Sequence, residues 1–245
     1  MQLNNQIQSY SLTERSQGRV FDQLDFEQMD SGLYSKQIGV DVCSHRQIPD
    51  SVVLRLHENG HKASPDSCLE YARISGNSYR FEKSAIELFE NSEFKITHIG
   101  KTLIRTVEQE ISVGDIVQNK SIFKSGRKIG LSFTMSSGEL FLGGPEDHRG
   151  TIKNGTTFES YNVDALGLGG RGKYQNTPVF WSSKGYIIAV ISEGPVSLDF
   201  GDERTSVLEI STFQDSLDLL IAPFENPTIA FQVFREVFSP VKGVP

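Results

Sequence analysis

Residues 158–186, FESYNVDALGLGGRGKYQNTPVFWSSKGY, contain the pattern that decides how the chain is expected to fold. The segment begins as a strand-like run, continues with four glycines between Gly167 and Gly172, and returns to apolar sequence around Trp181, the only tryptophan. This pattern predicts a long loop held between two β-strands. Because a rigid β scaffold most often places its ligand contacts on such loops, we expect a binding role, with Asp164 at the mouth as the first candidate contact.

The sequence on both sides of this segment has the spacing of short strands in an antiparallel sandwich. Residues 186–192 (YIIAVIS) are almost continuously apolar between Gly185 and Gly194, which predicts a strand buried on both faces. The first eighty residues are less regular. An all-β fold follows, with further strands expected at 51–56, 79–81, 85–89, 94–99, 102–107, 129–135, 140–142, 196–200, 206–210 and 217–222.

The period of the apolar residues changes near the C-terminus. Asn226 is a favourable N-cap, Pro227 suits the first helical position, and apolar residues then recur at helical spacing as far as Phe238. A short helix is therefore expected to end near Phe238. The predicted organisation is one β-sandwich domain over residues 1–238, followed by a linker over residues 239–245.

Composition limits the possible partners. The formal charge of −7 and the pI near 5.3 argue against nucleic acid or an anionic membrane, because both need clustered Lys and Arg. No run reaches the length of a membrane span, and the first residues lack the pattern of a secretion signal. Cys43 and Cys68 are too few for a disulfide framework and lack metal-site spacing. We expect a soluble cytoplasmic protein without a metal or cofactor.

Residues 57–61, HENGH, match the H-E-x-x-H motif of zinc peptidases. That motif works only on a helix, where both imidazoles face one ion. Here the preceding residues are strand-like, and Asn59-Gly60 is a strong turn signal. We therefore expect an exposed hairpin turn and not a metal site.

Residues 167–173, GLGGRGK, match the spacing of a phosphate-binding loop. Tyr174 stands where that loop needs Ser or Thr, and Pro178 restricts the residues that would have to open the following helix. A nucleotide site is not expected.

No catalytic triad can be assembled from the histidines, which lie in dissimilar polar surroundings and are all expected at the surface: His45, His57, His61, His98 and His148. The polar cluster Glu146, Asp147 and His148 could face a ligand, and a solvated turn explains it equally well. For Asp164, a capping or turn role remains the alternative to a ligand contact.

Three segments together resemble family 31 glycoside hydrolases, the α-glucosidase and α-xylosidase family. They are residues 140–146 (LFLGGPE), 161–164 (YNVD) and 174–186 (YQNTPVFWSSKGY), and their order and spacing agree with the N-terminal domain of those enzymes. The resemblance covers about residues 81–245. Pro145 interrupts the usual Gly-Glu turn, and Tyr161 replaces the usual tryptophan, so the sugar preference is not carried over.

The resemblance implies a galactose-mutarotase-like antiparallel β-sandwich with a short C-terminal helix, ahead of a (β/α)8 barrel. In that family the retaining aspartate pair lies on the barrel. No such barrel fits in 245 residues, so we expect no catalytic residue here and no activity from the chain alone. The implied partners are the chain's own C-terminal barrel and an α-linked oligosaccharide, and a homo-oligomer is possible.

The same resemblance makes Asp164 and Asn162 the substrate-binding residues. A carboxylate that accepts hydrogen bonds from sugar hydroxyls orients a substrate without breaking a bond. Two other functions compete with this one. A free-standing mutarotase or epimerase would need an acid and a base, for which His148 and Glu146 are the candidates. A carbohydrate-binding or interaction module would expose an apolar patch instead.

Overall fold

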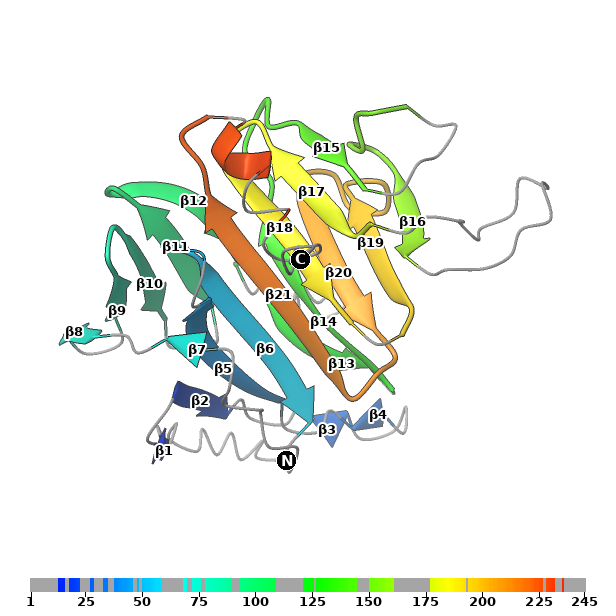
Figure 1. Cartoon of the computed structure of the whole chain (residues 1–245). Helices are drawn as coiled ribbons and strands as arrows, with labels where there is room; N and C mark the ends of the chain where they lie inside the picture. The colour runs from blue at the N-terminus through cyan, green and yellow to red at the C-terminus, as the bar shows by residue number, and fades with distance from the viewer. Residues whose placement is uncertain are drawn as a thin grey trace, which may run out of the picture.

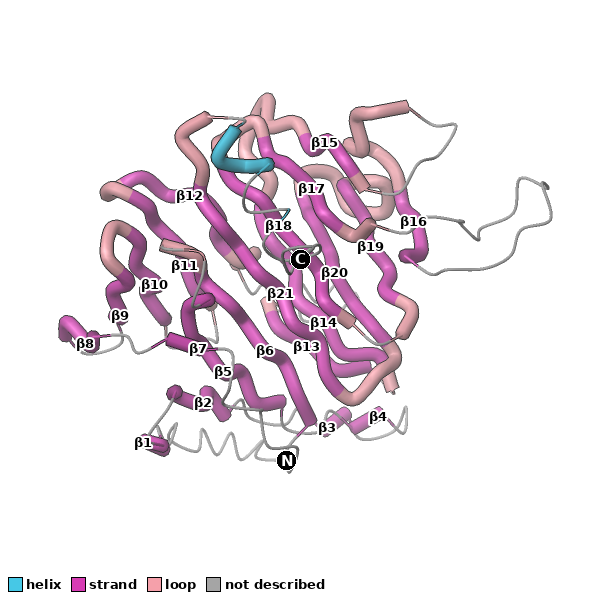
Figure 2. Tube along the Cα trace, viewed as in Figure 1, coloured by secondary structure: helices cyan, strands magenta, loops and turns pink. Residues whose placement is uncertain are grey.

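The computed structural model describes residues 13–15, 18–22, 27–28, 33–34, 38–45, 48, 50–58, 68–69, 72–75, 78–89, 93–108, 121–125, 127–144, 150–160, 177–192, 194–226, 228–231 and 235. Within these ranges the chain is built from β-strands, with one helical turn near the C-terminus (Figure 2). All paired strands are antiparallel. The predicted all-β antiparallel fold is therefore confirmed.

The largest sheet has nine strands over the described residues, in the order β1-β2-β5-β6-β21-β18-β17-β15, with β7 paired to β5. In Figure 1 it forms the front layer. Its strands are β1 (Thr13–Arg15), β2 (Gly18–Asp22), β5 (Ile38–His45), β6 (Val52–Glu58), β7 (Cys68–Leu69), β15 (Phe141–Gly143), β17 (Val179–Ser182), β18 (Tyr186–Ile191) and β21 (Ser216–Pro223).

Two five-stranded sheets make up the rest of the described sandwich, in the orders β13-β14-β20-β19-β16 and β12-β11-β10-β9-β8. A bridge between Thr106 and Phe133 joins β12 to β14. The strands are β8 (Ala72–Ser75), β9 (Ser78–Phe81), β10 (Ser84–Leu88), β11 (Phe94–His98), β12 (Lys101–Arg105), β13 (Ile122–Ser125), β14 (Lys128–Thr134), β16 (Thr157–Ser160), β19 (Val196–Phe200) and β20 (Val207–Thr212); β3 (Glu27–Gln28) pairs separately with β4 (Leu33–Tyr34).

The strands predicted from short apolar runs are all present, with ends that differ by one or two residues. The runs between residues 79 and 107 form the meander β9 to β12. Strand β18 is buried on both faces, as predicted. Its alternate residues Ile188 and Val190 face the core between the sheets, whereas Ile187 and Ala189 pack on the outer face of the large sheet.

Strands β6 and β21, which are far apart in sequence, lie side by side in the middle of the large sheet. Leu54 pairs with Leu219, and Arg55 pairs with Asp218. The Arg55 Nε donates to Asp218 Oδ1 at 2.7 Å, and a second guanidinium nitrogen bonds the other carboxylate oxygen. This two-pronged ion pair reinforces the junction of strands that are far apart in sequence.

The core between the sheets is centred on aromatic side chains. Phe200 of β19 lies 4.8 Å from Phe180, 5.3 Å from Phe141 and 5.8 Å from Phe158, measured between ring centroids. All four rings are buried. Because these rings come from β15, β16, β17 and β19, they join the two sheets at one end of the sandwich.

The helix predicted near the C-terminus is present at residues 228–231, and the predicted N-cap is confirmed. The Asn226 Oδ1 accepts the backbone N–H of Thr228 at 3.0 Å and of Ile229 at 3.2 Å. Ala230 is buried against the outer face of the large sheet. Pro227, the expected helix end at Phe238 and the expected linker lie outside the described residues.

The turn between β11 and β12 holds a strained residue. Ile99 and Gly100 both have positive φ, 49° and 74°, as in the two-residue hairpin turns that favour Asn-Gly. A β-branched side chain is costly in this conformation, and Ile99 is 60% exposed, so its packing offsets little of the strain.

Replacing Ile99 by asparagine should therefore raise the free energy of unfolding by about 1 kcal/mol, because asparagine tolerates the left-handed region. Urea unfolding would measure this. Ile99→Val keeps the branched Cβ and should give no gain. If Ile99→Asn and the unmodified chain have the same free energy of unfolding, Ile99 is not strained in this turn.

Candidate functional site

The long loop singled out in the sequence connects the two layers of the sandwich. It leaves β16, which belongs to a five-stranded sheet, and enters β17, which belongs to the large sheet. The two strands predicted to flank this segment are confirmed, whereas residues 161–176 between them lie outside the described residues. Asn162 and Asp164 lie outside the described residues, so their roles as sugar contacts stay predictions. The structure describes the strand ends on either side of this segment, which we call the base of the loop.

The β17 side of this base is fixed by backbone hydrogen bonds to two neighbouring strands. The N–H of Gly144, just after β15, donates to the carbonyl of Val179 at 2.8 Å, and the N–H of Val190 on β18 donates to the carbonyl of Pro178 at 2.9 Å. The N–H of Val179 donates to the carbonyl of Thr177 at 2.7 Å. The loop therefore enters β17 at a point held from both sides.

Gly143 and Gly144 let the end of β15 approach β17 closely. Both have positive φ, 102° and 74°. A Cβ at Gly143 would lie 2.6 Å from the carbonyl oxygen of Val179, and a Cβ at Gly144 would lie 2.5 Å from the ring of Phe180. Only glycine meets both requirements, the backbone conformation and the contact distance.

The aromatic core supports both ends of the loop at once. Phe158 lies two residues before Ser160, where β16 ends, and Phe180 lies two residues after Pro178. The two rings are 5.4 Å apart between centroids. The strand that leads into the loop and the strand that leaves it are thus parts of one packed unit.

A buried carboxylate that the sequence reading missed joins β15, β17 and β18. Glu139 is 3% exposed. Its Oε1 accepts hydrogen bonds from the Ser182 hydroxyl and, at 2.5 Å, from the Tyr186 hydroxyl, and its Oε2 accepts the N–H of Ser136 at 2.8 Å. Burial, and next the charge of Glu139, raises the pKa of Tyr186 well above its usual range.

Asn154 extends this network to the edge of the large sheet. Its Oδ1 accepts the N–H of Phe141 at 2.8 Å, and its Nδ2 donates to the carbonyl of Glu139 at 2.9 Å. Among the described residues three donors reach the Glu139 carboxylate, so its role is to hold strands together.

In the H-E-x-x-H segment, one prediction from the sequence is wrong: the exposure of His57. His57 and Glu58 belong to strand β6, so the strand prediction is confirmed and a helical zinc site is excluded for these two residues. His57 was expected at the surface but is only 6% exposed. Strand β6 lies between β5 and β21, and His57 pairs with Gly39 and Ser216 on either side, which buries it. Asn59 to His61 are outside the described residues.

The other histidine and acidic candidates add no site. The Nδ1 of His98 lies 3.0 Å from the Ser84 hydroxyl, within the meander. Glu146, Asp147 and His148 lie outside the described residues. Within the part of the chain that the structure describes, no three His, Cys, Asp or Glu side chains gather closely enough to hold a metal ion.

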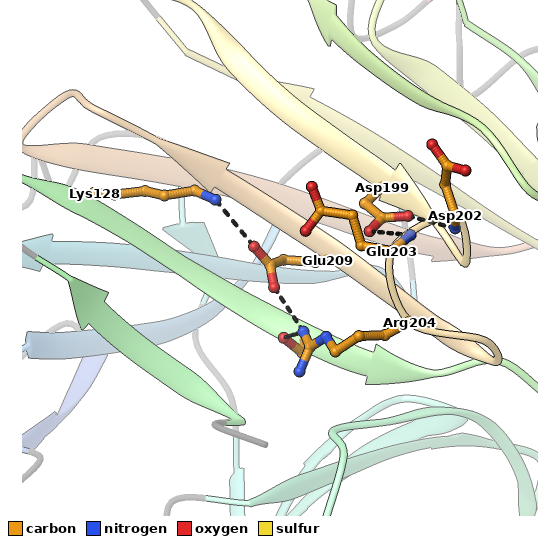
Figure 3. Close-up of polar contacts among 7 residues, drawn as sticks. Lys128, Asp199, Asp202, Glu203, Arg204 and Glu209 are labelled. Carbon is orange, nitrogen blue, oxygen red and sulfur yellow. Dashed lines mark hydrogen bonds and ion pairs between the residues drawn. The ribbon is translucent and has the colours of Figure 1, made fainter. Parts of the chain in front are cut away.

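A polar network covers part of the outer face of the sheet that contains β14, β19 and β20 (Figure 3). Glu209 bonds Lys128 at 3.1 Å and Arg204 at 2.6 Å, and Arg204 also donates to the Ser132 hydroxyl at 3.0 Å. Asp199 accepts the N–H groups of the turn that follows β19. These partly exposed ion pairs each contribute about 0–1 kcal/mol. The charges are used within the chain to fix that turn.

No helix among the described residues is long and apolar enough to cross a bilayer.

Known proteins similar to this chain are carbohydrate-active enzymes. An α-xylosidase of Emericella nidulans is 32% identical over 93 residues, which is 38% of this chain and 12% of that enzyme. A GH31 dextranase of Flavobacterium johnsoniae, solved with isomaltotriose, has a TM-score of 0.65 at 15% identity over 94% of this chain and 27% of its own.

A cycloalternan-forming enzyme of Listeria monocytogenes, solved with a pentasaccharide substrate, has a TM-score of 0.70 at 12% identity over 96% of this chain and 22% of its own. At such identities the structural likeness establishes the fold alone. The chain spans about an eighth to a quarter of the length of these relatives.

The match to a family sequence model covers more of this chain than the match to the α-xylosidase does. The model of the glycosyl hydrolase 31 N-terminal galactose mutarotase-like domain matches residues 43–199. It covers most of the two-layer core and the whole long loop, and it begins earlier than the segments that carried the resemblance in the sequence. The chain therefore belongs to the family of glycosyl hydrolase 31 N-terminal galactose mutarotase-like domains.

Proposed function

We propose that the chain is the non-catalytic N-terminal domain of a retaining α-glycosidase, and that its long loop lines the substrate pocket of a (β/α)8 catalytic barrel. Residues 1–238 would form the domain and residues 239–245 the linker to the barrel. The observation that carries the proposal is the base of the loop, where Phe158 and Phe180 of different sheets pack together. A loop held at both ends can present a side chain to a neighbouring domain at a defined position.

Asp164 and Asn162 are the residues proposed to contact the sugar. The carboxylate of Asp164 would accept hydrogen bonds from two sugar hydroxyls, and Asn162 would add neutral polar contacts. Both act in orientation, while the barrel supplies the nucleophile and the acid. The low cysteine content supports the cytoplasm as the place of action.

The substrate class is proposed as an α-linked oligosaccharide or glycoside. Support comes from the relatives, which are an α-xylosidase and a dextranase solved with isomaltotriose. Tyr161, one of the two departures of this sequence from the family pattern, directly precedes the proposed contact Asn162, so the sugar itself is left open.

The first test measures hydrolysis of aryl α-glucosides and α-xylosides. We expect no turnover from the chain alone. Turnover is expected when the chain is co-expressed with the catalytic portion of the E. nidulans α-xylosidase, produced without the part homologous to this chain and checked for a cooperative unfolding transition. In that mixture Asp164→Ala should raise KM about 10- to 100-fold, because a hydrogen bond to a charged group contributes about 1.5–3 kcal/mol.

Asp164→Asn keeps the shape of the side chain but removes its charge. The KM of this variant should lie between that of the unmodified chain and that of Asp164→Ala. Hydrolysis by the purified chain alone would overturn the proposal. So would anomer interconversion by the chain alone that disappears on His148→Ala, because that outcome indicates a mutarotase.

A further inference from the structure

An apolar row crosses the outer face of the large sheet as far as β15, whose outer side is covered by residues 152–154. Ile152 bridges Leu142 of β15, Leu142 pairs with Trp181 of β17, and Trp181 pairs with Ile187 of β18. Directly paired residues of antiparallel strands point to the same side of a sheet. We call Ile152, Leu142 and Trp181 the edge row.

The edge row is open where the rest of this face is covered. Ile187 and its neighbour Ala222 are fully buried beneath the helical turn at residues 228–231, which Figure 1 shows over the upper part of the front sheet. Toward the edge the cover ends. Leu142 and Trp181 are half-buried, and Ile152 is 48% exposed.

A row of this kind differs from the other exposed apolar side chains. Ile99 lies at a hairpin tip, and Phe213 lies in the turn between β20 and β21, each as a single residue, which is ordinary for a protein surface. The edge row joins three large side chains across neighbouring strands and continues into a buried apolar cluster. None of the three residues carries a charge.

The edge row also lies beside the base of the long loop. Trp181 is on the strand that the loop enters, two residues after Val179, and Leu142 immediately precedes Gly143, which contacts Val179. A neighbouring domain that contacts the β17 end of the loop would lie near the edge row.

We infer that the edge row is the docking surface for the catalytic domain of the glycoside hydrolase to which this domain belongs. The inference rests on the proposed function. A protein partner fits better than a sugar, because the three side chains offer a single hydrogen-bonding group, the indole N–H of Trp181, whereas a sugar site needs several. Trp181 packs edge to face on Phe224, 6.5 Å away between ring centroids. The relatives are polypeptides four to eight times longer than the part matched here, so each contains further chain able to cover such a surface.

The experiment uses Trp181 as its own reporter. Because it is the only tryptophan, growth on 5-fluorotryptophan places one fluorine probe in the whole chain. The labelled chain is titrated with the catalytic portion of the E. nidulans α-xylosidase, and affinity is read from the fluorine resonance and from calorimetry. We expect the Trp181 resonance to shift on binding, and Ile152→Glu to weaken binding at least 10-fold.

The matched control is Phe213→Glu, which places the same charge at an exposed apolar site far from the edge row in sequence and on another turn. It should bind as the unmodified chain does. Leu142→Ser is a second, milder edge-row variant, and circular dichroism on heating checks that each variant keeps its fold. Ile152→Glu and Phe213→Glu with equal affinity would overturn the inference.

Four further outcomes also decide against it. If the chain alone forms dimers by sedimentation that Ile152→Glu abolishes, the row binds a second copy. If isomaltotriose alone shifts the Trp181 resonance and Ile152→Glu prevents this, the row binds sugar. If Ile152→Glu leaves the rate of hydrolysis by the mixture unchanged, the edge row is not the docking surface, but the proposed function is retained. No binding and no hydrolysis with the unmodified chain would reject both.

Discussion

Replacing Glu139 by alanine should lower the free energy of unfolding by about 3 kcal/mol or more, because each buried donor left without an acceptor costs about 1–3 kcal/mol. Three donors lose their partner: the Ser182 hydroxyl, the Tyr186 hydroxyl and the Ser136 N–H. Urea unfolding followed by circular dichroism measures the change. Glu159→Ala, on the exposed side of β16, is the control and should change stability by less than about 0.5 kcal/mol.

A double-mutant cycle separates this network from simple loss of volume. Tyr186→Phe removes one donor, and combined with Glu139→Ala it should cost less than the sum of the two single changes, because the second change then removes a group already left unpaired. Strict additivity, or a loss below about 1 kcal/mol for Glu139→Ala, would contradict the role assigned to the carboxylate.

Gly143→Ala should lower the free energy of unfolding by about 3–4 kcal/mol, the sum of left-handed strain of about 1–2 kcal/mol and a collision with backbone. The added Cβ would lie 2.6 Å from the carbonyl oxygen of Val179, and that oxygen also accepts the N–H of Gly144. The strands β15 and β17 would have to separate at the point where the long loop enters.

Gly138→Ala is the matched control for this change. Gly138 also has a positive φ, 72°, but a Cβ there would meet nothing within 4 Å. Its alanine variant should cost only the backbone term, about 1–2 kcal/mol. The difference between the two variants in thermal and urea unfolding isolates the close approach of β15 to β17. Equal losses of unfolding free energy in Gly143→Ala and Gly138→Ala would contradict this, because they would show that the contact with the Val179 carbonyl costs nothing.

Local pattern was enough to predict most strands, because each buries an apolar side or an apolar run that is visible in the sequence. Strand β18 is the clearest case, since its unbroken apolar run needs cover on both faces and has it. The N-cap at Asn226 was equally visible, because capping depends on neighbours within three residues.

Features that depend on distant partners were not visible. His57 was expected at the surface because His-Glu-Asn-Gly is polar, but β6 is a central strand and buries it. Glu139 follows Ser-Ser-Gly and reads as a turn, and only the arrival of Ser182 and Tyr186 from about forty-five residues later makes it a buried acceptor. The crossing of the long loop between sheets depends in the same way on strand partners. Asn162 and Asp164 remain predictions.

The pairing of β6 with β21 has a consequence for biosynthesis. The neighbours of β6 are β5, which precedes it directly, and β21, which begins at Ser216. While the chain emerges from the ribosome, Val52, Leu54 and their neighbours must wait for more than 150 further residues before that side of the strand can pair. Contacts of such long range slow folding and leave an apolar edge open to wrong partners. Strand β6 is thus made early but completes its pairing only after β21 has been synthesised.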